Sequence, residues 1–206
     1  MLQELVLASN GLGAAGAVAI ATALRKNSTL VELDLTLNDI GRDGARAMAW
    51  AMTNSPCALG RLTIDANDIG PAGAAAMADM LKQNERLHSC WLRHNDIGND
   101  GAASLADAIE GSNTDVTTLG LVTQYDDQGI RAELLRRIEG YLLRNMRAAA
   151  IVRSAATRAE GFVVVESPDF KDLQVRNGAV AQALSKDDCL AAMGLTNQPS
   201  ARQDFF

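Results

Sequence analysis

Three residues of metal-ligand type lie close together in the sequence, at His88, Cys90 and His94. Imidazole and thiolate groups are common zinc ligands, but a structural zinc site normally brings four such groups together. Cys90 also occupies a position that the repeat pattern described below gives to leucine, so its side chain is expected to point into a hydrophobic core. We therefore predict no metal at this cluster and no cofactor elsewhere in the chain.

The sequence contains none of the common catalytic motifs. A phosphate-binding loop (Gly-x-x-x-x-Gly-Lys-Ser/Thr), a nucleophile elbow (Gly-x-Ser-x-Gly), a His-Glu-x-x-His zinc site and a Cys-x-x-Cys pair are all missing. Two adjacent acids, Asp126 and Asp127, fall in a predicted turn, where carboxylates are usually solvated. The prediction is a protein that is not an enzyme.

Binding is better supported than catalysis, because polar and aromatic residues alternate with apolar ones along short predicted strands. Side chains of a strand point alternately to its two faces, so the polar set would line one face of a sheet. The candidate protein-binding residues are Glu32, Asp34, Arg61, Asp65, Trp91 and Arg93. Trp and Arg are enriched in interface hot spots, and the acidic members suit a basic segment of a partner. Trp91 has an alternative interpretation that stays open: its side chain covers neighbouring strands or contacts the tail instead of binding a partner.

A repeat positions these candidate residues. The pattern Leu-x-x-Leu-x-Leu-x-x-Asn, with an occasional Ile or Cys in place of Leu, ends at Asn10, Asn38, Asn67 and Asn95, which lie 28 or 29 residues apart. A fifth copy ends at Gln124. Each asparagine is expected to satisfy backbone groups in the turn after the strand, because a buried amide needs hydrogen-bond partners.

Each of the first four copies is followed by an apolar residue, a glycine and, three residues later, Gly-Ala. Apolar residues then recur at helical spacing, and the alanines between them would let neighbouring helices pack closely. The two apolar columns are Ile20, Met48, Met77 and Leu105, and Leu24, Met52, Leu81 and Ile109. The pattern predicts one strand and one helix in each repeat.

The phrases Asn-Asp-Ile-Gly-x-x-Gly-Ala and Ala-Leu-x-x-Asn-x-Thr-Leu (residues 23–30) resemble the ribonuclease-inhibitor-like class of leucine-rich repeat. NOD-like receptors and the Ran GTPase-activating protein carry repeats of this class. The resemblance covers residues 2 to about 145. It implies an α/β solenoid, a curved horseshoe segment in which parallel strands line the concave face and helices cover the convex face.

The predicted organisation is a leucine-rich-repeat domain over residues 1–145, with five repeats of which the last is degenerate, and a helical C-terminal extension and tail over residues 146–206. From Ile130 to about Glu160 apolar residues follow one helical stripe, which predicts a helix that caps the solenoid. Its arginines form either a solvated face or a patch for an acidic partner or a membrane surface. All four phenylalanines follow residue 160, and the composition leaves open whether this tail is folded.

The N-terminal edge is the least expected part of the predicted solenoid. The first strand begins at Leu2, whereas a solenoid normally needs a capping unit over its terminal repeat. Three explanations stay open: the sequence is part of a longer protein, its start is wrongly assigned, or the uncapped edge pairs with another copy or a partner. We favour the first explanation, and self-association through this edge remains an alternative.

A second unusual residue is Trp50, which lies in a helix column that the other repeats fill with Thr22, Asp79 and Asp107. Those residue types are typical of an exposed position. Packing between helices and a contact on the convex face are the two explanations for this tryptophan.

Composition narrows the classes of function. The chain has 206 residues, a net charge of -6 and a pI near 4.9, whereas a nucleic-acid binder is usually basic. No apolar run approaches the roughly 20 residues that a membrane span needs, and the start lacks the pattern of a secretory signal. Three cysteines cannot form a disulfide framework. We expect a cytoplasmic protein.

Together these features predict a non-catalytic scaffold that binds a partner protein through the concave face of a leucine-rich-repeat solenoid. The resemblance to the Ran activator implies one alternative, a regulator of a small GTPase of the GTPase-activating type, although no motif specific to that activity occurs. A second alternative is the sensing fragment of a larger receptor or effector. Fold alone does not decide among these functions.

Overall fold

The computed structural model describes residues 2–53, 55–111, 115–121 and 129–157 of the chain, with the backbone alone for residues 151–157. The chain divides into two compact units, residues 1–145 and residues 146–206. Gln124, the Asp126–Asp127 pair and the phenylalanine-containing tail lie outside the described residues. The following description concerns the first unit and the helix that begins in it and continues to residue 157.

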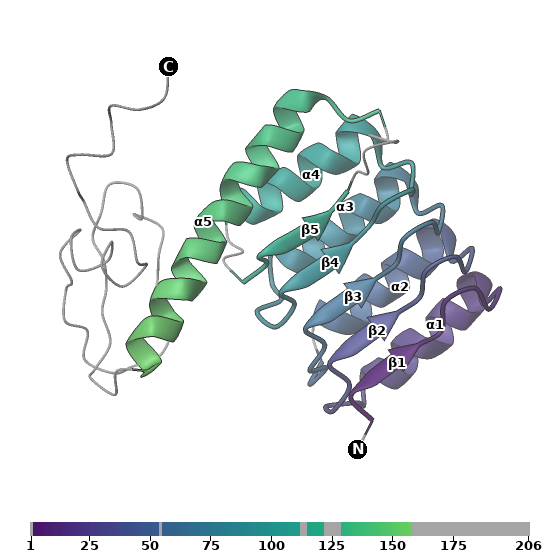
Figure 1. Cartoon of the computed structure of the whole chain (residues 1–206). Coiled ribbons are helices and arrows are strands. Elements are labelled where there is room, and N and C mark those ends of the chain that lie inside the picture. The colour runs from purple at the N-terminus through teal and green to yellow at the C-terminus, as the bar shows by residue number, and fades with distance from the viewer. Residues whose placement is uncertain (1, 54, 112–114, 122–128, 158–206) are drawn as a thin grey trace, which may run out of the picture. The chain divides into compact units, whose positions relative to one another are not determined.

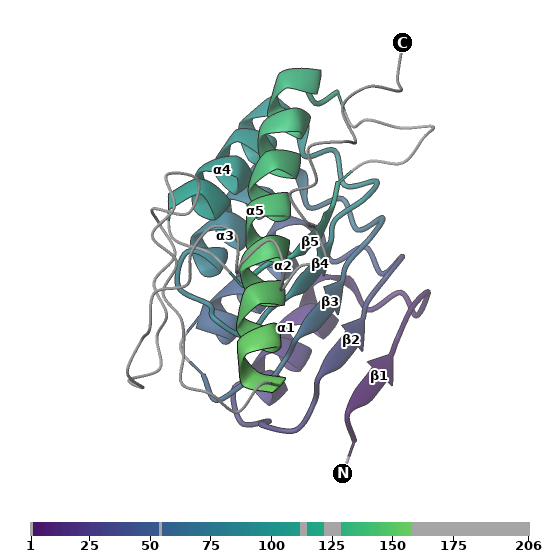
Figure 2. The same ribbon diagram turned by 60° about the vertical axis from the view of Figure 1, so that its left-hand side comes forward.

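Strands and helices alternate along this unit, as the repeat pattern predicts. The elements are β1 (Glu4–Val6), α1 (Gly13–Leu24), β2 (Glu32–Asp34), α2 (Gly41–Thr53), β3 (Arg61–Thr63), α3 (Gly70–Leu81), β4 (Ser89–Trp91), α4 (Gly98–Gly111), β5 (Thr118–Gly120) and α5 (Ala132–Thr157). The strands form one parallel sheet in the order β1-β2-β3-β4-β5. Figure 1 shows this sheet in front of a layer made by α1 to α4, and Figure 2 shows the two layers from another side. The predicted α/β solenoid is confirmed.

The central leucine of each strand keeps the same register across the sheet. Leu33 pairs with Leu62, and Leu62 pairs with Cys90. These three side chains are buried, and they belong to one hydrophobic cluster with Met48 and Met77 of the helices. Burial of this apolar layer is the main force that holds the repeats together.

An asparagine ladder joins consecutive repeats at the ends of the strands. The Asn67 Oδ1 atom accepts the backbone N–H groups of Asn38 and Ile40 at 3.0 and 3.3 Å, and its Nδ2 atom donates to the carbonyls of Leu35 and Asp65. Asn38 makes the equivalent bonds one repeat earlier. Both side chains are fully buried, so the structural role predicted for these amides is confirmed.

The Gly-Ala pairs bring neighbouring helices into close contact. A Cβ atom on Gly101 would lie only 2.3 Å from the Ile97 Cγ2 atom and 2.8 Å from the Ala74 Cβ atom. Gly44 faces Ala17 in the same way, with 2.9 Å to its Cβ. At Gly44, Gly73 and Gly101 the glycine is therefore required by packing, because a side chain there would meet an alanine of the preceding helix and push the helices apart.

The helix α5 covers the last repeat, as predicted, and two of its arginines bind α4. The Arg144 Nη2 atom donates to the Ile109 carbonyl at 2.7 Å, at the C-terminal end of α4 where helix carbonyls lack partners. Arg137 forms ion pairs with Asp107, at 2.8 Å, and with Glu110. Neither arginine belongs to a solvated face or a free basic patch, because both connect α5 to α4.

Candidate functional site on the concave face

The sheet register gathers the predicted binding residues into rows on the face opposite the helices. Glu32 is the register partner of Arg61, and Asp34 shares a row with Thr63 and Trp91. Asp65 lies two residues after Thr63, and Arg93 lies two residues after Trp91. Because side chains alternate between the two faces, Asp65 and Arg93 lie on the same face as these residues. The solenoid thus provides a continuous surface built from single residues of successive repeats.

Trp91 is half-buried and its ring is held on several sides. The indole Nε1 donates to the Ser89 Oγ atom at 3.0 Å. The ring lies over Gly120 of β5, where an added Cβ would come within 2.3 Å of the ring atom Cε3. The Arg93 guanidinium lies 4.6 Å from the ring centre. Trp91 therefore covers the neighbouring strand, and part of its ring stays accessible.

Asp65 fixes the arginine that stacks on this tryptophan. Its Oδ2 atom accepts hydrogen bonds from Arg93 Nε at 2.8 Å and Nη2 at 2.6 Å, and its Oδ1 atom accepts the Arg93 backbone N–H at 2.8 Å. Asp65 is only 5 % exposed, whereas the Arg93 side chain is 37 % exposed. The expectation of an acidic surface at Asp65 is therefore wrong, because the arginine covers and neutralises it. We call Asp65, Ser89, Trp91 and Arg93 the tryptophan ledge.

The acidic character of the concave face is concentrated at its N-terminal end. Glu4, Glu32 and Asp34 line a hollow of about 210 Å³ over β1 to β3. Arg61 is the cation of this hollow, and its Nη1 atom lies 2.7 Å from the Glu32 carboxylate. Asp34 accepts hydrogen bonds from the backbone N–H and the hydroxyl of Thr36 at 2.9 and 2.6 Å.

Sequence reasoning missed two residues that shape the ledge. Ser89 orients the indole, and its position two residues before Trp91 in the same strand was the available signal. Gly120 provides the space for the ring. The signal there was that the fifth repeat has a glycine at a strand position where the other four repeats have a side chain. Both roles depend on contacts between strands or between neighbouring positions, which the leucine pattern does not describe.

The residues of metal-ligand type do not form a site. Burial, with a smaller contribution from the charge of Asp65, raises the pKa of the Cys90 thiol to about 12, so this sulfur stays protonated at neutral pH. Within the described ranges, no three His, Cys, Asp or Glu side chains are placed to hold a metal ion. Likewise, none of the described helices is long and apolar enough to span a membrane.

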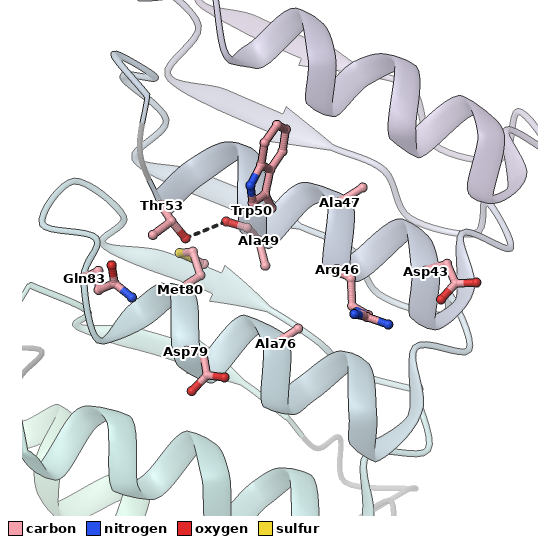
Figure 3. Close-up of a pocket in the computed structure, with 10 residues that line it drawn as sticks. All are labelled: Asp43, Arg46, Ala47, Ala49, Trp50, Thr53, Ala76, Asp79, Met80 and Gln83. Atoms are coloured by element: carbon pink, nitrogen blue, oxygen red, sulfur yellow. Dashed lines mark hydrogen bonds between the residues drawn. The ribbon is translucent and has the colours of Figure 1, made fainter.

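Trp50 lies on the convex side, away from the ledge. Its side chain is 58 % exposed, and the Arg25 guanidinium stacks 4.1 Å from the ring centre. Figure 3 shows Trp50 beside a hollow of about 510 Å³ between α2 and α3, with Arg46 and Asp79 at its rim. Trp50 is therefore a surface residue whose ring also contacts the C-terminal end of α1 through Arg25.

Comparisons with known proteins agree with the repeat assignment. A family model described as "Leucine Rich repeat" matches residues 1–21, 26–49 and 92–106. "NACHT, LRR and PYD domains-containing protein 12" from Mus musculus is 31% identical over 91 residues, which are 44% of this chain and 9% of that protein. Protein 14 of the same description is 32% identical over 120 residues, 58% of this chain and 12% of that protein. The chain thus spans about a tenth of the length of these relatives.

Two solved structures share the fold. One is described as leiomodin-1 actin-binding site 2, with a TM-score of 0.68 and 20% identity, covering 76% of this chain and 87% of that one. The other is a tropomodulin C-terminal domain from Caenorhabditis elegans, with a TM-score of 0.63 and 17% identity, covering 74% of this chain and 89% of that one. At this identity the likeness concerns the fold. This chain carries leucine-rich repeats that resemble those of NOD-like receptors.

Proposed function

We propose that this protein is a non-catalytic scaffold that binds a partner protein through the concave face of its sheet. Its leucine-rich repeats form a protein-interaction domain, and none of the matched families is catalytic. The concave face is the side that the helices leave uncovered. We place the centre of binding at the tryptophan ledge.

The observation that carries this proposal is that the side chains of the tryptophan ledge are already held in place by their neighbours. Trp91 and Arg93 are residue types that dominate interface hot spots, and both are fixed by neighbours before any partner arrives. A side chain that is already ordered loses little conformational entropy on binding. The cost of leaving a Trp and an Arg partly exposed is then compensated by affinity for a partner.

The acidic hollow beside the ledge indicates which charge a partner segment should carry. Glu4, Glu32 and Asp34 outnumber the single Arg61 there, so the hollow attracts positive charge. A partner segment that combines an apolar side chain for the ledge with lysine or arginine for the hollow would complement both surfaces. Charge complementarity of this kind increases the association rate and depends on salt concentration.

The test is affinity purification from cell lysate with three versions of the full chain: the natural sequence, Trp91→Ala and Trp50→Ala. Trp50 is the matched control because it is the chain's other tryptophan and lies on the convex side. We expect at least one protein to be lost with Trp91→Ala and kept with Trp50→Ala, with affinity weakened by about 2 kcal/mol or more. Identical protein sets for all three, at equal thermal stability, would overturn the concave-face assignment.

Actin is a suitable first purified partner, because the leiomodin-1 fragment with the same fold is described as an actin-binding site. Co-sedimentation with actin filaments and a monomer-binding assay would test it directly. A panel of small GTPases tests the regulator alternative. A scaffold leaves their GTP hydrolysis rates unchanged, whereas stimulation of any one of them would replace the scaffold function by a regulatory one.

A further inference from the structure

The sequence of α2 departs from the repeat at two positions of the convex side. Trp50 stands where α1, α3 and α4 have Thr or Asp, and Arg46 stands where they have Val or Ala. The two residues are four positions apart, so they are neighbours on one face of α2. Both side chains are exposed, and the apolar core that the repeats share therefore accounts for neither of them.

Both residues line the hollow of about 510 Å³ between α2 and α3, which we call the convex hollow (Figure 3). The two helices contribute small apolar side chains to it, among them Ala47 and Ala76, beside the buried Met80. An apolar side chain of a partner that covered this floor and the exposed indole would remove apolar surface from water.

The ionised groups around the convex hollow leave one positive charge without a partner. The two acids of the hollow are each bound to a cation of the same helix region: the Asp43 carboxylate lies 3.4 Å from Arg42 Nε, and the Asp79 carboxylate lies 2.8 Å from Lys82 Nζ. Within the described ranges, Arg46 forms no ion pair. Its guanidinium therefore keeps its N–H donors available for a ligand.

A second arginine reaches the same surface from the C-terminal end of α1. The Arg25 guanidinium lies 4.1 Å from the centre of the Trp50 ring. The Arg93 guanidinium of the tryptophan ledge is neutralised by Asp65, whereas Arg25 has no acidic partner in the part of the chain that the structure describes. A cation stacked on an indole keeps its charge and its donors. Trp50 is thus accompanied by two arginines whose charge is not compensated.

We propose that the convex hollow binds an acidic segment of a partner protein, with an apolar side chain of that segment beside Trp50. Carboxylates of the segment would pair with Arg46 and Arg25, because pairs of guanidinium and carboxylate are strong and often bidentate. The apolar side chain would lie over the alanines of α2 and α3. Both parts of the segment are needed, since the hollow offers charge and apolar surface together.

The charge preference of this site is opposite to that of the concave face. On the concave face Glu4, Glu32 and Asp34 favour a basic segment, whereas the two arginines beside Trp50 favour an acidic one. A scaffold with both surfaces can hold two chemically different segments at once, one on the sheet and one on the helix layer. The convex site adds to the proposed function and does not depend on the tryptophan ledge.

A protein segment fits the convex hollow better than a nucleic acid does. A nucleic-acid backbone binds to an extended run of cations, and Asp43 and Asp79 interrupt any such run here. The net charge of the chain, -6, also opposes a long polyanion. A short segment with a few carboxylates needs only the local charge of Arg25 and Arg46, and it brings the apolar side chain that the alanine floor accommodates.

The test selects peptides from a displayed random library on the full natural chain and discards those that also bind Trp50→Ala. If that variant unfolds at a lower temperature than the natural chain, Arg46→Glu takes its place. We expect the remaining peptides to combine Asp or Glu with a large apolar residue. Fluorescence anisotropy with a synthetic copy of the strongest peptide then measures affinity. Arg46→Glu should raise the dissociation constant at least about tenfold, because it reverses one charge of the site, and added salt should raise it as well.

Arg136→Glu is the matched control, because Arg136 is an exposed arginine of α5 that does not line the hollow. It should leave the dissociation constant nearly unchanged, and so should Trp91→Ala, which separates this site from the concave face. The absence of peptides that depend on Trp50, enrichment of Lys and Arg in them, or equal effects of Arg46→Glu and Arg136→Glu would overturn the proposal. Peptides that match residues 158–206 would also overturn it, because the chain's own C-terminal segment would then be the occupant.

Discussion

At the scale of single residues, Asp65 is a positioning group for the arginine of the ledge. It accepts three hydrogen bonds from Arg93, one of them from the backbone. The sequence identifies Asp65 as a residue of the concave face, because it follows β3 with the right alternation. The sequence does not reveal its burial, since that depends on an arginine 28 residues away in the next repeat.

Replacing Asp65 by alanine should destabilise the fold by about 2 kcal/mol, because the charged donors of Arg93 lose their acceptor. Glu32→Ala is the matched control: it removes the other ion pair of this face, which is exposed and should contribute less than about 1 kcal/mol. Urea unfolding of both variants measures the difference. Equal losses of unfolding free energy would contradict the role given to Asp65.

At the scale of helices and strands, the contact between α3 and α4 depends on a glycine. Gly101 lies against the Ala74 side chain, whereas Gly140 of α5 has no atom within 4 Å of where its Cβ would stand. Gly101→Ala should destabilise the protein by about 1 to 3 kcal/mol through overpacking. Gly140→Ala should stabilise it by about 0.5 to 1 kcal/mol, because alanine favours the helix. Thermal unfolding of the two variants tests this, and a shared direction of change would refute the packing argument.

The connection between α4 and α5 should depend on pH. The Arg137 hydrogen bond, followed by that of Tyr141, lowers the pKa of Glu110 below its ordinary value. A lowered folded-state pKa stabilises the fold above the unfolded-state pKa, and this stabilisation is lost as pH falls through the folded-state value. Glu110→Gln should therefore lower the unfolding midpoint at neutral pH and have a smaller effect at roughly pH 3. Glu139→Gln, an exposed glutamate of α5, is the control and should change neither.

These elements show where sequence analysis succeeds and where it ends. The repeated leucines, asparagines and Gly-Ala pairs predict every strand and helix from β1 to α4, because each repeat uses the same contacts with its neighbours. The roles of Arg137 and Arg144 were not predicted, because α5 is not a repeat and its partners lie about 30 residues away. That Trp91 covers a neighbouring strand was one of the interpretations that the sequence left open, but the glycine beneath its ring was not identified, because that contact joins side chains of two different repeats.

At the scale of the whole repeat unit, the asparagine ladder makes interior repeats more sensitive than the first one. Asn67 serves two neighbouring repeats and is fully buried, whereas Asn10 is exposed and its Nδ2 donates only to the nearby carbonyls of Leu7 and Ala8. Asn67→Ala should cost at least about 2 kcal/mol, because buried donors and acceptors lose partners. Asn10→Ala should cost less than about 1 kcal/mol. Denaturant unfolding of both variants compares the two positions, and a larger loss at Asn10 would contradict the ladder.

Cys90, the one cysteine in the central column of the sheet, can also report how often this part of the structure opens. Cys90 is inaccessible and its thiol stays protonated, so a thiol reagent reaches it only while β4 is separated from the helices. The rate at which Cys90 is labelled therefore reports how often the middle of the solenoid opens, without any introduced probe. The tryptophan ledge includes Ser89 and Trp91, the two neighbours of Cys90 in β4. A partner that binds the ledge stabilises the closed state, so labelling of Cys90 should become slower as the affinity of the partner increases.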